Sequence, residues 1–392
     1  MQLEDFQSLL SPVGQVALQA AVDMRPVEAD FLRCQAVLSR SFSPEMARAA
    51  LEIAILRREA EEKFPYADRM YFSRQALEQA SSYAISTYRA QRFQPFSRLA
   101  DLGCSIGGDT LALAAVAPVV GIDLDPLRLA MARANLDALG LANRAGFVRA
   151  DLSSGLPLRS DPSSGLFFDP ARRSGHRRAF SVHAYQPPLS IVQDWLRRTP
   201  ALGVKISPGV NLDELGPYDA EVEFISLSGE LKEAVLWFGP LKTAHRRATL
   251  LPGPHTLERQ DGPLERLPLS EPRAYLYEPD PAVLRAGLVG NLGQLLGAAQ
   301  LDPDIAYLTA DERLVTPFAR AWQVETWLPF QLKRLREALR QRHVGQVVVK
   351  KRGSPLQPDD LIRQLRLEGD QQRVIFLTHL RGRPIAILAY TE

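Results

Sequence analysis

Apolar residues in the first 95 positions recur at steps of three and four among Glu, Arg and Gln. This spacing is typical of helices with one buried face, and no Asn-Gly or Gly-Gly turn interrupts it. The segment Ser43-Pro44-Glu45-Met46 marks a helix start, with the Ser43 side chain as N-cap and Pro44 in the first turn. We therefore predict an N-terminal helical region over residues 1–95.

Short apolar runs alternate with helical stretches from residue 96 onward. The runs expected to form strands are residues 98–102, 119–123, 146–151, 166–169 and 202–206. Such alternation is typical of βαβ units around a buried parallel sheet. Two further runs, 221–227 and 233–238, are too close together for a crossover helix, so they should pair antiparallel. The pattern predicts a Rossmann-like α/β domain over residues 96–250, with five parallel strands and a terminal antiparallel hairpin.

Prolines and glycines are frequent between residues 252 and 273, and this composition predicts a linker or an irregular surface segment. Beyond it, an accessory α/β segment completes the range 251–322, with an expected strand 273–277, helix 281–296 and strand 305–308. The elements expected at the C-terminal end are helix 331–342, strand 346–350, helix 358–365, and strands 373–380 and 384–390. They predict a small α+β module over residues 323–392.

The bulk composition narrows the class of protein only slightly. The 392 residues suffice for two or three domains of roughly 150 residues each, and the net charge of +2 indicates no particular partner. Two cysteines are too few for a disulfide framework, and we expect no signal peptide, because no basic segment followed by a long apolar run comes after Met1. No apolar stretch approaches the 18 or so residues of a membrane span. We expect a soluble, cytoplasmic protein with no membrane partner, in which any nucleic-acid surface comes from local clusters of Lys and Arg.

A glycine-rich segment, Asp101-Leu102-Gly103-Cys104-Ser105-Ile106-Gly107-Gly108-Asp109-Thr110, follows the first predicted strand. Gly103 and Gly107 allow a tight turn and leave no Cβ in the way of a ligand. Asp109 or Thr110 can cap the helix that follows. Asp101, at the end of the strand, can accept a hydrogen bond from a cationic amino-acid group.

Two further carboxylates follow the next two predicted strands. Asp123 comes about 20 residues after Asp101, where an acidic side chain can hold ribose hydroxyls, and Asp151 can accept from an adenine amino group. Because parallel strands end at one edge of a sheet, the three carboxylates predict a nucleoside site. The main alternative is a nicotinamide dinucleotide, but Ser105 stands where that fingerprint has a glycine, and Asp101 would repel a pyrophosphate.

The segment Phe167-Phe168-Asp169-Pro170-Ala171-Arg172-Arg173 follows the fourth predicted strand. The Asp169 carboxylate and the Pro170 carbonyl can align an attacking nitrogen and stabilise the charge that develops on it. The simpler interpretation is that Asp169 only ends the strand and forms a turn. Likewise, the basic run 172–178 suits nucleic-acid phosphates or forms a solvated loop.

Over residues 97–240 the chain resembles the class I S-adenosylmethionine-dependent methyltransferases. The resemblance implies S-adenosyl-L-methionine as cofactor, with residues 101–107 as the first cofactor motif and Ser105 in place of its usual middle glycine. The cofactor-binding residues that it implies are Asp101, Gly103, Cys104, Gly107, Asp123 and Asp151. We expect the Cys104 thiol to be a small packing group and not a nucleophile.

Methyltransferases that act on planar nitrogen carry a [D/N]-P-P-[Y/F/R/W] motif after the fourth strand, which implies Asp169 and Pro170 as catalytic residues. The third position is Ala171 here, and no aromatic residue follows. The aromatic side chains that would then have to stack a base are Phe167, Phe168, Phe180 and Tyr185, or one from the N-terminal helices.

Nearly the whole chain resembles a bacterial group of methyltransferases with a C-terminal THUMP-like domain. The segments that carry this resemblance are 62–65, 71–80, 169–173, 184–189, 228–233, 278–281 and 350–353. The group is similar to RNA-cap guanine-N2 methyltransferases and, more distantly, to tRNA guanine-N1 methyltransferases. THUMP domains bind RNA in tRNA-modifying enzymes, so the resemblance implies RNA, tRNA or rRNA, as the partner. We expect no metal. The substrate-binding residues that we expect are Arg172, Arg173, Arg74, Gln75, Gln79, Lys350, Lys351 and Arg352.

Three functions remain open. The leading hypothesis is methylation of a base nitrogen in structured RNA. The second is methylation of a small molecule or protein, and the third is an RNA-binding protein that keeps the fold without turnover. Asp169-Pro170 argues against the third function, whereas the absence of an aromatic residue at position 172 keeps it open.

Overall fold

The computed structural model describes residues 1–159, 161–171, 173–174, 177–178, 181–259 and 266–391. Their contacts divide the chain into two compact units. The first unit consists of Met1–Glu221 and Glu233–Thr243, and the second of Val222–Lys232 and Ala244–Glu392.

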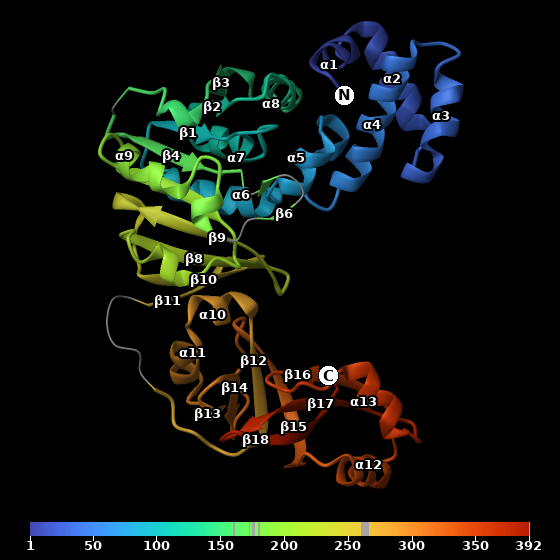
Figure 1. Ribbon diagram of the computed structural model, residues 1–392, viewed down its shortest axis with the longest axis vertical. Coiled ribbons are helices and arrows are strands. Elements are labelled where there is room, and N and C mark those ends of the chain that lie inside the picture. Colours follow the sequence, from blue (N-terminus) through green and yellow to red (C-terminus); the bar gives the residue numbers. More distant parts are fainter. Residues whose placement is uncertain (160, 172, 175–176, 179–180, 260–265, 392) are drawn as a thin grey trace. The chain divides into compact units, whose positions relative to one another are not determined.

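The first unit begins with the predicted helical region. Its helices are α1 (Leu3–Leu9), α2 (Pro12–Asp23), α3 (Phe31–Leu38), α4 (Pro44–Ala60), α5 (Arg74–Gln79) and α6 (Tyr83–Ala90). The long helix α4 packs against α1, α2 and α3, and buries small residues such as Ala47, Ala50 and Ala54 there (Figure 1). The predicted helix start is confirmed, because Ser43 Oγ accepts a hydrogen bond from Met46 N at 3.3 Å.

A mostly parallel sheet follows these helices, as predicted. Its strands in this unit are β1 (Arg98–Leu102), β2 (Val119–Asp123), β3 (Ala145–Arg149), β4 (Ser164–Phe168), β7 (Ala201–Ile206) and β9 (Glu230–Phe238). Neighbours pair in parallel in the order β7-β4-β1-β2-β3, and β9 runs antiparallel to β7. The connecting helices are α7 (Gly108–Val116), α8 (Pro126–Ala138) and α9 (Val192–Leu196). The five parallel strands predicted from the apolar runs are therefore confirmed.

The predicted terminal hairpin is also present. Strand β8 (Ala220–Leu227) leads into β9 through the turn Ser228-Gly229, where both φ angles are positive, at 53° and 81°. Turns of this kind join adjacent antiparallel strands. The complete strand order of the sheet is β11-β10-β8-β9-β7-β4-β1-β2-β3.

Two strands beyond the hairpin were not predicted. Strand β10 (Arg246–Leu251) is parallel to β8, and β11 (His255–Arg259) is antiparallel to β10. The linker predicted for the proline-rich stretch is therefore wrong over His255–Arg259. This strand lies at the edge of the sheet and is mostly exposed, so its residues do not show the apolar alternation that marks a strand.

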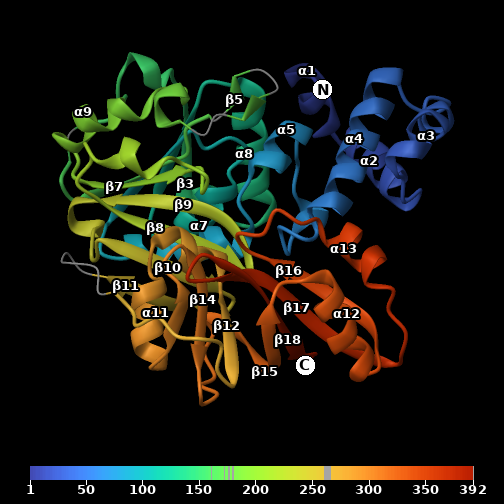
Figure 2. The same ribbon diagram turned by 60° about the horizontal axis from the view of Figure 1, so that its bottom comes forward.

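A second sheet, with seven strands, forms much of the second unit (Figure 2). Its order is β13-β14-β12-β15-β18-β17-β16. The strand bounds are β12 (Tyr275–Pro279), β13 (Ala299–Asp302), β14 (Ile305–Ala310), β15 (Ala319–Pro329), β16 (Val344–Lys351), β17 (Gln371–Leu380) and β18 (Arg383–Tyr390). The accessory segment 251–322 and the C-terminal module 323–392 thus contribute strands to one sheet.

Four helices accompany this sheet among the described residues: α10 (Pro281–Ala286), α11 (Val289–Leu296), α12 (Leu332–Gln341) and α13 (Pro358–Leu365). The single helix predicted over 281–296 is wrong. Gly287 ends α10 in a left-handed conformation with φ of 70°, and a second helix starts at Val289. Glycine adopts this conformation without the steric cost that other residues incur, and it commonly ends helices in this way.

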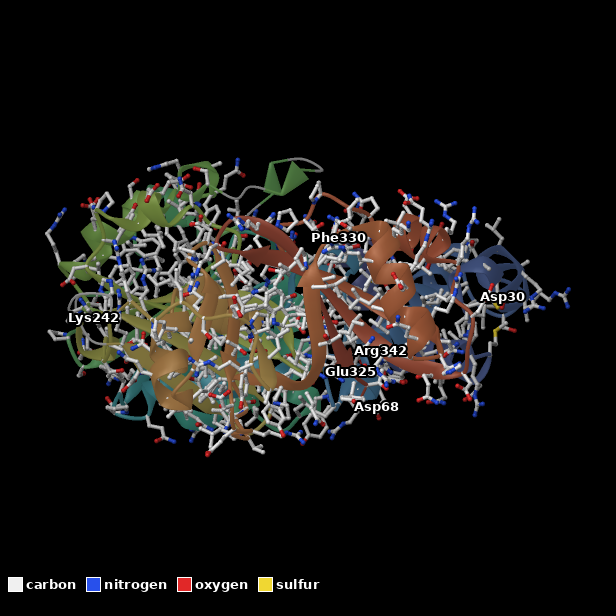
Figure 3. All side chains as sticks on the ribbon, turned by 90° about the horizontal axis from the view of Figure 1, so that it is seen from below. Asp30, Asp68, Lys242, Glu325, Phe330 and Arg342 are labelled. Carbon is white, nitrogen blue, oxygen red and sulfur yellow. The ribbon has the colours of Figure 1, made fainter. Side chains whose placement is uncertain are left out.

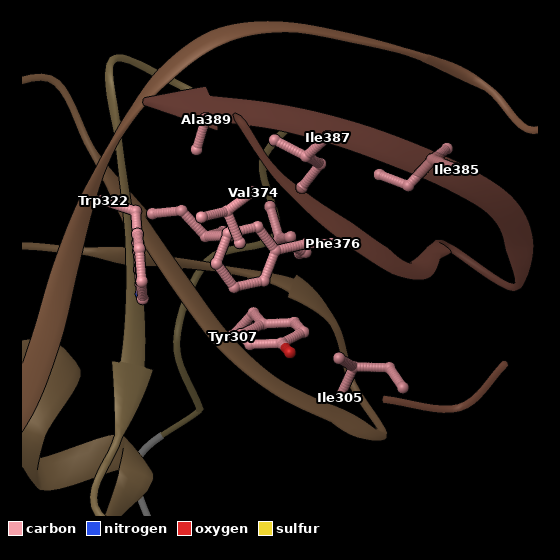
Figure 4. Close-up of a cluster of buried hydrophobic side chains, with 10 residues drawn as sticks. Ile305, Tyr307, Trp322, Val374, Phe376, Ile385, Ile387 and Ala389 are labelled. Carbon is pink, nitrogen blue, oxygen red and sulfur yellow. The ribbon is translucent and has the colours of Figure 1, made fainter. Parts of the chain in front are cut away.

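Strand β15 connects the two halves of the seven-stranded sheet. Its first half pairs with β12 and its second half with β18, with an irregularity between Val324 and Thr326. One core cluster takes residues from both halves, and Figure 4 shows it: Leu276, Leu301, Ile305, Tyr307, Trp322, Val374, Phe376, Ile385, Ile387 and Ala389. The rings of Tyr307 and Trp322 both pack edge-on against Phe376, with centroids 5.5 Å apart.

The opposite face of the same sheet carries α12 and α13. Alternate residues of β17, Ile375 and Leu377, join a second cluster with leucines of both helices, as expected for side chains that alternate between the two faces of a strand. Glu325 of β15 pairs with Arg342 at 3.1 Å and with Arg373 at 2.7 Å (Figure 3). Ion pairs and apolar contacts therefore both hold the end of α12 on this sheet.

Candidate active site

The glycine-rich segment forms a tight loop between β1 and α7. The backbone N–H groups of Gly103 and Cys104 both donate to Ile122 O of β2, at 2.8 and 3.0 Å. Gly103 has a φ of 77°, and a Cβ there would lie 2.7 Å from Asp169 O, so only glycine fits. The loop is therefore held against β2 on one side and against the end of β4 on the other.

The expected capping of α7 by Asp109 or Thr110 is wrong. The N-cap is Gly107, with a φ of 82° and no side-chain cap. Thr110 Oγ1 instead donates to Asp101 Oδ2 at 2.5 Å, and Asp109 accepts from Ser86 Oγ at 2.6 Å. The two side chains are occupied by partners on neighbouring elements and therefore do not turn back to the start of their own helix.

Asp101 is fully buried at the end of β1. Among the described residues, no donor reaches its Oδ1 atom. Burial raises the pKa of the Asp101 carboxyl well above its usual range, and the charges of Asp109 and Asp169 add to this shift, while the Thr110 hydrogen bond and Arg89 oppose it. A buried acceptor without a partner is costly unless a ligand supplies a donor.

Asp123 ends β2 with both carboxylate oxygens fixed by backbone amides. Oδ2 accepts from Ser105 N and Oδ1 from Asp125 N, each at 2.9 Å. Each oxygen keeps a second lone pair, so the carboxylate is oriented and still able to accept hydroxyl hydrogen bonds. Asp125 caps α8, because its side chain accepts from Leu127 N at 2.8 Å.

Asp151 lies near this edge, but it does not close the third strand as predicted. Strand β3 ends at Arg149, and Ala150 N then donates to Asp123 O at 3.1 Å. The exposed Asp151 side chain accepts from Ser153 N at 2.8 Å and caps a short 3-10 turn. Its local bond is thus that of an ordinary cap.

The Cys104 thiol is buried against β2. A Cβ on Gly121 would lie 3.1 Å from its Sγ atom, which shows how closely the loop and this strand pack. Burial raises the pKa of the Cys104 thiol well above its usual range, and the charges of Asp101 and Asp123 raise it further. The surroundings disfavour a thiolate and agree with a packing role for this side chain.

Asp169 follows β4 immediately beside the loop. Its N–H donates to Leu102 O at 3.0 Å, which continues the pairing of β4 with β1. Its Oδ2 atom accepts from Lys205 Nζ at 2.6 Å, and the two side chains are 23% and 2% exposed. Lys205 also donates to the backbone carbonyl of Gln79 at 3.3 Å. The predicted catalytic carboxylate is thus half of an ion pair with a buried lysine.

Lys205 was missed from the sequence, although a signal was present. It is the one charged residue in the apolar run 201–206, which forms the buried strand β7. A lysine at such a position needs an acidic partner, because a buried unpaired charge is very costly. The run indicates that a partner exists but does not identify it.

A second buried cation, Arg89 of α6, was also missed. It forms ion pairs with both Asp109 and Glu233, which in turn accept from Ser86 and Ser81. Burial lowers the pKa of Arg89, but the charges of Asp109 and Glu233 outweigh this effect, and the net pKa lies above its usual value. This network joins α6, the start of α7 and β9.

Arg89 also stacks over the Phe167 ring, with its guanidinium carbon 4.6 Å from the centroid. Phe167, Phe168 and Tyr185 are each 2% exposed or less. Phe168 packs edge-on against Trp195, and the Tyr185 hydroxyl accepts from Ser207 N at 2.9 Å. The expectation that these rings stack a base is wrong, because the core covers them, and Phe180 lies outside the described residues.

The substrate-binding residues predicted on α5 have different environments. Arg74 is exposed and pairs with Glu28 at 2.8 Å and Glu59 at 3.0 Å, both in the N-terminal helices. The Gln75 side chain accepts from Arg128 of α8 at 3.1 Å. Gln79 reaches the Asp169–Lys205 pair through its carbonyl, so α5 meets this pair at its C-terminal end.

The predicted basic residues elsewhere are divided between the two units. Arg172 lies outside the described residues, and the backbone of Arg173 belongs to β5 (Arg173–Ser174), which pairs with β6 (Arg177–Arg178) shortly after Asp169. Lys350, Lys351 and Arg352 lie on or just after β16 in the second unit.

Within the described residues there is no helix long and apolar enough to cross a membrane and no group of acidic, His or Cys side chains suited to a metal.

The most informative relative comes from Mycobacterium tuberculosis. An uncharacterized S-adenosylmethionine-dependent methyltransferase, present in strains CDC 1551 / Oshkosh and H37Rv, is 37% identical over 315 residues, which cover 79% of this chain and 84% of the relative. A crystal structure from Porphyromonas gingivalis W83, assigned as a methyltransferase, superposes with a TM-score of 0.76 at 21% identity and covers 93% of this chain and 98% of that one. It shows that the fold is shared almost from end to end.

Two family models match parts of the chain. A THUMP domain-like model matches residues 319–390, and a model for a domain of unknown function (DUF8688) matches residues 2–60. The relative's identity and coverage establish the family, and the sheet order agrees with it. The chain belongs to the S-adenosylmethionine-dependent methyltransferases, with the class I sheet and a C-terminal THUMP-like domain.

Proposed function

We propose that this methyltransferase modifies a base nitrogen of structured RNA, tRNA or rRNA. The observation that carries the proposal is the position of Asp169, with Oδ2 held by Lys205 and the backbone in contact with Gly103 of the cofactor loop. In support of the proposal, the Asp169 carboxylate has a fixed orientation and lies beside the loop that we expect to hold the methyl donor. The THUMP-like match at residues 319–390 favours RNA as the acceptor molecule.

The residues of the loop fit S-adenosylmethionine. The unpartnered Oδ1 of Asp101 suits the ammonium group of the donor, and the fixed carboxylate of Asp123 suits the ribose hydroxyls. Gly103, Cys104 and Gly107 leave the backbone open to close approach, and Asp151 would accept from the adenine amino group. The bound donor supplies an electrophilic methyl group that needs no further activation.

The chain's own contribution to the reaction is then mainly orientation. The Asp169 carboxylate and the Pro170 carbonyl accept hydrogen bonds from N–H groups of the base that is methylated, and so align its nitrogen. The carboxylate also stabilises positive charge as it develops on that nitrogen. Lys205 keeps the carboxylate in place through Oδ2, and the pair is itself positioned by the Gln79 carbonyl.

The test is to incubate the purified protein with a donor that carries a labelled methyl group and, separately, with total RNA, DNA, protein and small-molecule extract. We expect label in RNA, and digestion to nucleosides should recover it on a base. Asp123→Ala serves as the control, because loss of a charge-assisted hydrogen bond should weaken S-adenosylhomocysteine binding by about 1.5–3 kcal/mol. Label in small molecules or protein would support the second function, and RNA binding without any label would support the third.

A further inference from the structure

The second unit contains a cavity of about 640 Å³. Its walls come from the β8–β9 turn, the end of β10 and start of β11, the junction of β12 with α10, the start of β15 and the end of β16. Pockets that bind small ligands commonly measure about 300–1,000 Å³, so one nucleotide fits in this volume. The charged and titratable side chains of its wall are Arg320, Lys350, Arg352, His255, Glu278 and Asp280.

The cationic residues of the cavity rest on aromatic rings of the sheet. The Arg320 guanidinium carbon lies 4.0 Å from the Trp322 centroid, and that of Arg352 lies 4.9 Å from the Tyr307 centroid. Lys350 Nζ lies 5.3 Å from the same Trp322 ring. Because these rings lie in the core cluster, they orient the cationic side chains before a ligand binds. Binding then costs less side-chain conformational entropy.

Two carboxylates share the wall with these cations. Glu278 accepts from Lys350 Nζ at 2.5 Å. Asp280 accepts from Ala282 N at 2.8 Å at the start of α10. A cavity with guanidinium groups and carboxylates suits a ligand that has an anionic group together with hydroxyl or N–H donors.

We propose that this cavity binds a ribonucleotide unit of the RNA substrate. Arg320 and Arg352 contact its phosphate through planar guanidinium forks, which match phosphate oxygens in geometry as well as charge. Glu278 and Asp280 accept hydrogen bonds from the ribose 2′-hydroxyl or from base N–H groups. The inference rests on the proposed function for the identity of the molecule that carries the nucleotide.

The alternation of side chains along β16 distinguishes this cavity from a general basic patch. Lys350 and Arg352 line the cavity, whereas Lys351 between them is exposed and donates to Gln357 at 3.2 Å. The sequence-based prediction groups all three as substrate-binding residues. The cavity includes only the two that share one side of the strand.

Fluorescence anisotropy with a labelled single-stranded RNA oligonucleotide tests the proposal at about 100 mM salt. Arg320→Ala combined with Arg352→Ala should weaken binding by about 10-fold or more, because both arginines make charge-assisted contacts. Lys351→Ala is the matched control and should change the affinity by less than about 2-fold, the range typical of exposed charges. Equal losses in both variants, or no loss in the double variant, would overturn the proposal.

Two further measurements keep the test decisive. If circular dichroism shows that the Arg352 substitution disturbs folding through Tyr307, the exposed Arg320→Ala alone carries the comparison. On the wild type, adenosine monophosphate should displace the oligonucleotide at lower concentration than inorganic phosphate, and a DNA strand of the same sequence should bind more weakly. If phosphate competes as well as the nucleotide, or DNA binds as well as RNA, a ribonucleotide is not what the cavity recognises.

The outcome separates this inference from the proposed function. If the wild type methylates RNA and the double variant binds the oligonucleotide as tightly as the wild type, the proposed function stands. The cavity then has no part in RNA binding. If the wild type transfers no label to RNA, the proposed function is wrong, whatever the anisotropy shows. S-adenosylhomocysteine binding should be unchanged in the double variant, because both arginines belong to the second unit.

Discussion

The carboxyl groups around the cofactor loop outnumber the buried cations beside them. Arg89 pairs with Asp109 and Glu233, and Lys205 pairs with Asp169, whereas Asp101 and Asp123 accept hydrogen bonds from Thr110 and from backbone amides. This excess of negative charge favours a cationic ligand over a neutral one. The donor carries a sulfonium charge that the demethylated product lacks, so at the proposed donor site the same charge excess would favour exchange of product for fresh donor.

We expect Asp101 to make the stability of the ligand-free protein depend on pH. Its carboxyl has a raised pKa, chiefly because it is buried, so the folded state binds its proton more tightly than the unfolded state does. A group of this kind stabilises the fold at low pH, and its contribution is lost as the pH rises through the folded-state pKa. We expect Asp101→Asn, which does not ionise, to remove this loss and to be more stable than wild type at neutral and higher pH.

Thermal unfolding across a pH series, without donor, measures this difference. Asp137→Asn on the exposed side of α8 is the control for the loss of one carboxylate and should follow the wild type. S-adenosylhomocysteine should bind more weakly to Asp101→Asn, so stability and binding should change in opposite directions. If the two substitutions have the same effect on the pH profile, the raised pKa of Asp101 is not the source of the pH sensitivity.

Asp169 and Lys205 should act as one unit in catalysis. Asp169→Asn keeps the shape but removes the charge, so turnover should fall by about 100-fold or more while donor affinity changes little. Lys205→Met should also lower kcat, because the carboxylate loses the partner at 2.6 Å that orients it. The double variant should be no slower than Asp169→Asn alone, since residues that act through each other are not additive.

Single-turnover rates and donor titrations of the three variants complete this cycle. Lys205→Arg retains a cation and should recover part of the kcat that Lys205→Met loses. Additive losses in the double variant would show that Lys205 has a role independent of Asp169. If Asp169→Asn and Asp169→Ala both react at near wild-type rates, Asp169 has no catalytic role and only ends its strand.

At the scale of single elements, the N-cap of helix α4 contributes to the free energy of unfolding. Ser43 Oγ accepts from Met46 N at 3.3 Å, and α4 is packed among α1, α2 and α3. Ser43→Ala should therefore destabilise the protein by about 1 kcal/mol, the usual cost of losing such a cap. Denaturant unfolding measures this loss of stability. Ser43→Asp, which can cap equally well, should be as stable as the wild type. If Ser43→Ala does not change the free energy of unfolding, tertiary packing alone defines this helix start.

The elements that could be predicted share a physical property. Strands β1, β2, β4 and β7 are buried on both faces, so they appear in the sequence as short apolar runs. Strands β11 and β15 were missed because much of each is only partly buried, and polar residues occupy many of their positions. Strand β10 was also missed although it is buried, because Arg246, Arg247 and Thr249 interrupt its apolar run. The pattern of apolar residues therefore identifies a strand only where the buried residues are also apolar.

The candidate site shows the same division at the level of residues. The positions of Asp101, Asp123 and Asp169 could be predicted, because each lies at or directly after the end of a predicted strand. Arg89 could not, since its partners Asp109 and Glu233 come from distant parts of the chain and no spacing relates them. The Asp169 partner Lys205 was visible as an anomaly within an apolar strand, but only the folded chain identifies the pair.

On the scale of the whole molecule, the THUMP-like match does not coincide with a structural boundary. It begins at Ala319, the first residue of β15, and so excludes β12, which pairs with the first half of that strand. It also excludes Leu276, Leu301, Ile305 and Tyr307 from the core cluster. We expect a fragment of residues 319–392 to be unfolded or aggregated, because an unpaired strand edge and half a core would be exposed.

A fragment of residues 266–392 restores β12, β13 and β14 and is the matched comparison. It should give a cooperative thermal transition and dispersed amide resonances, whereas the shorter fragment should give neither. A well-folded 319–392 fragment would show that β15 and its neighbours are stable without the rest of the seven-stranded sheet.

The shared strand β15 also bears on how this part of the protein can be inherited. A recombination event that moved only the stretch recognised by sequence similarity would carry one edge of a sheet and leave its other half behind. The smallest cassette that could pass intact to another enzyme has to include β12 to β14 as well. Descent of this domain should therefore be traced over about the last third of the chain, and a homologue that keeps only the matched C-terminal stretch must have replaced the missing strands with others.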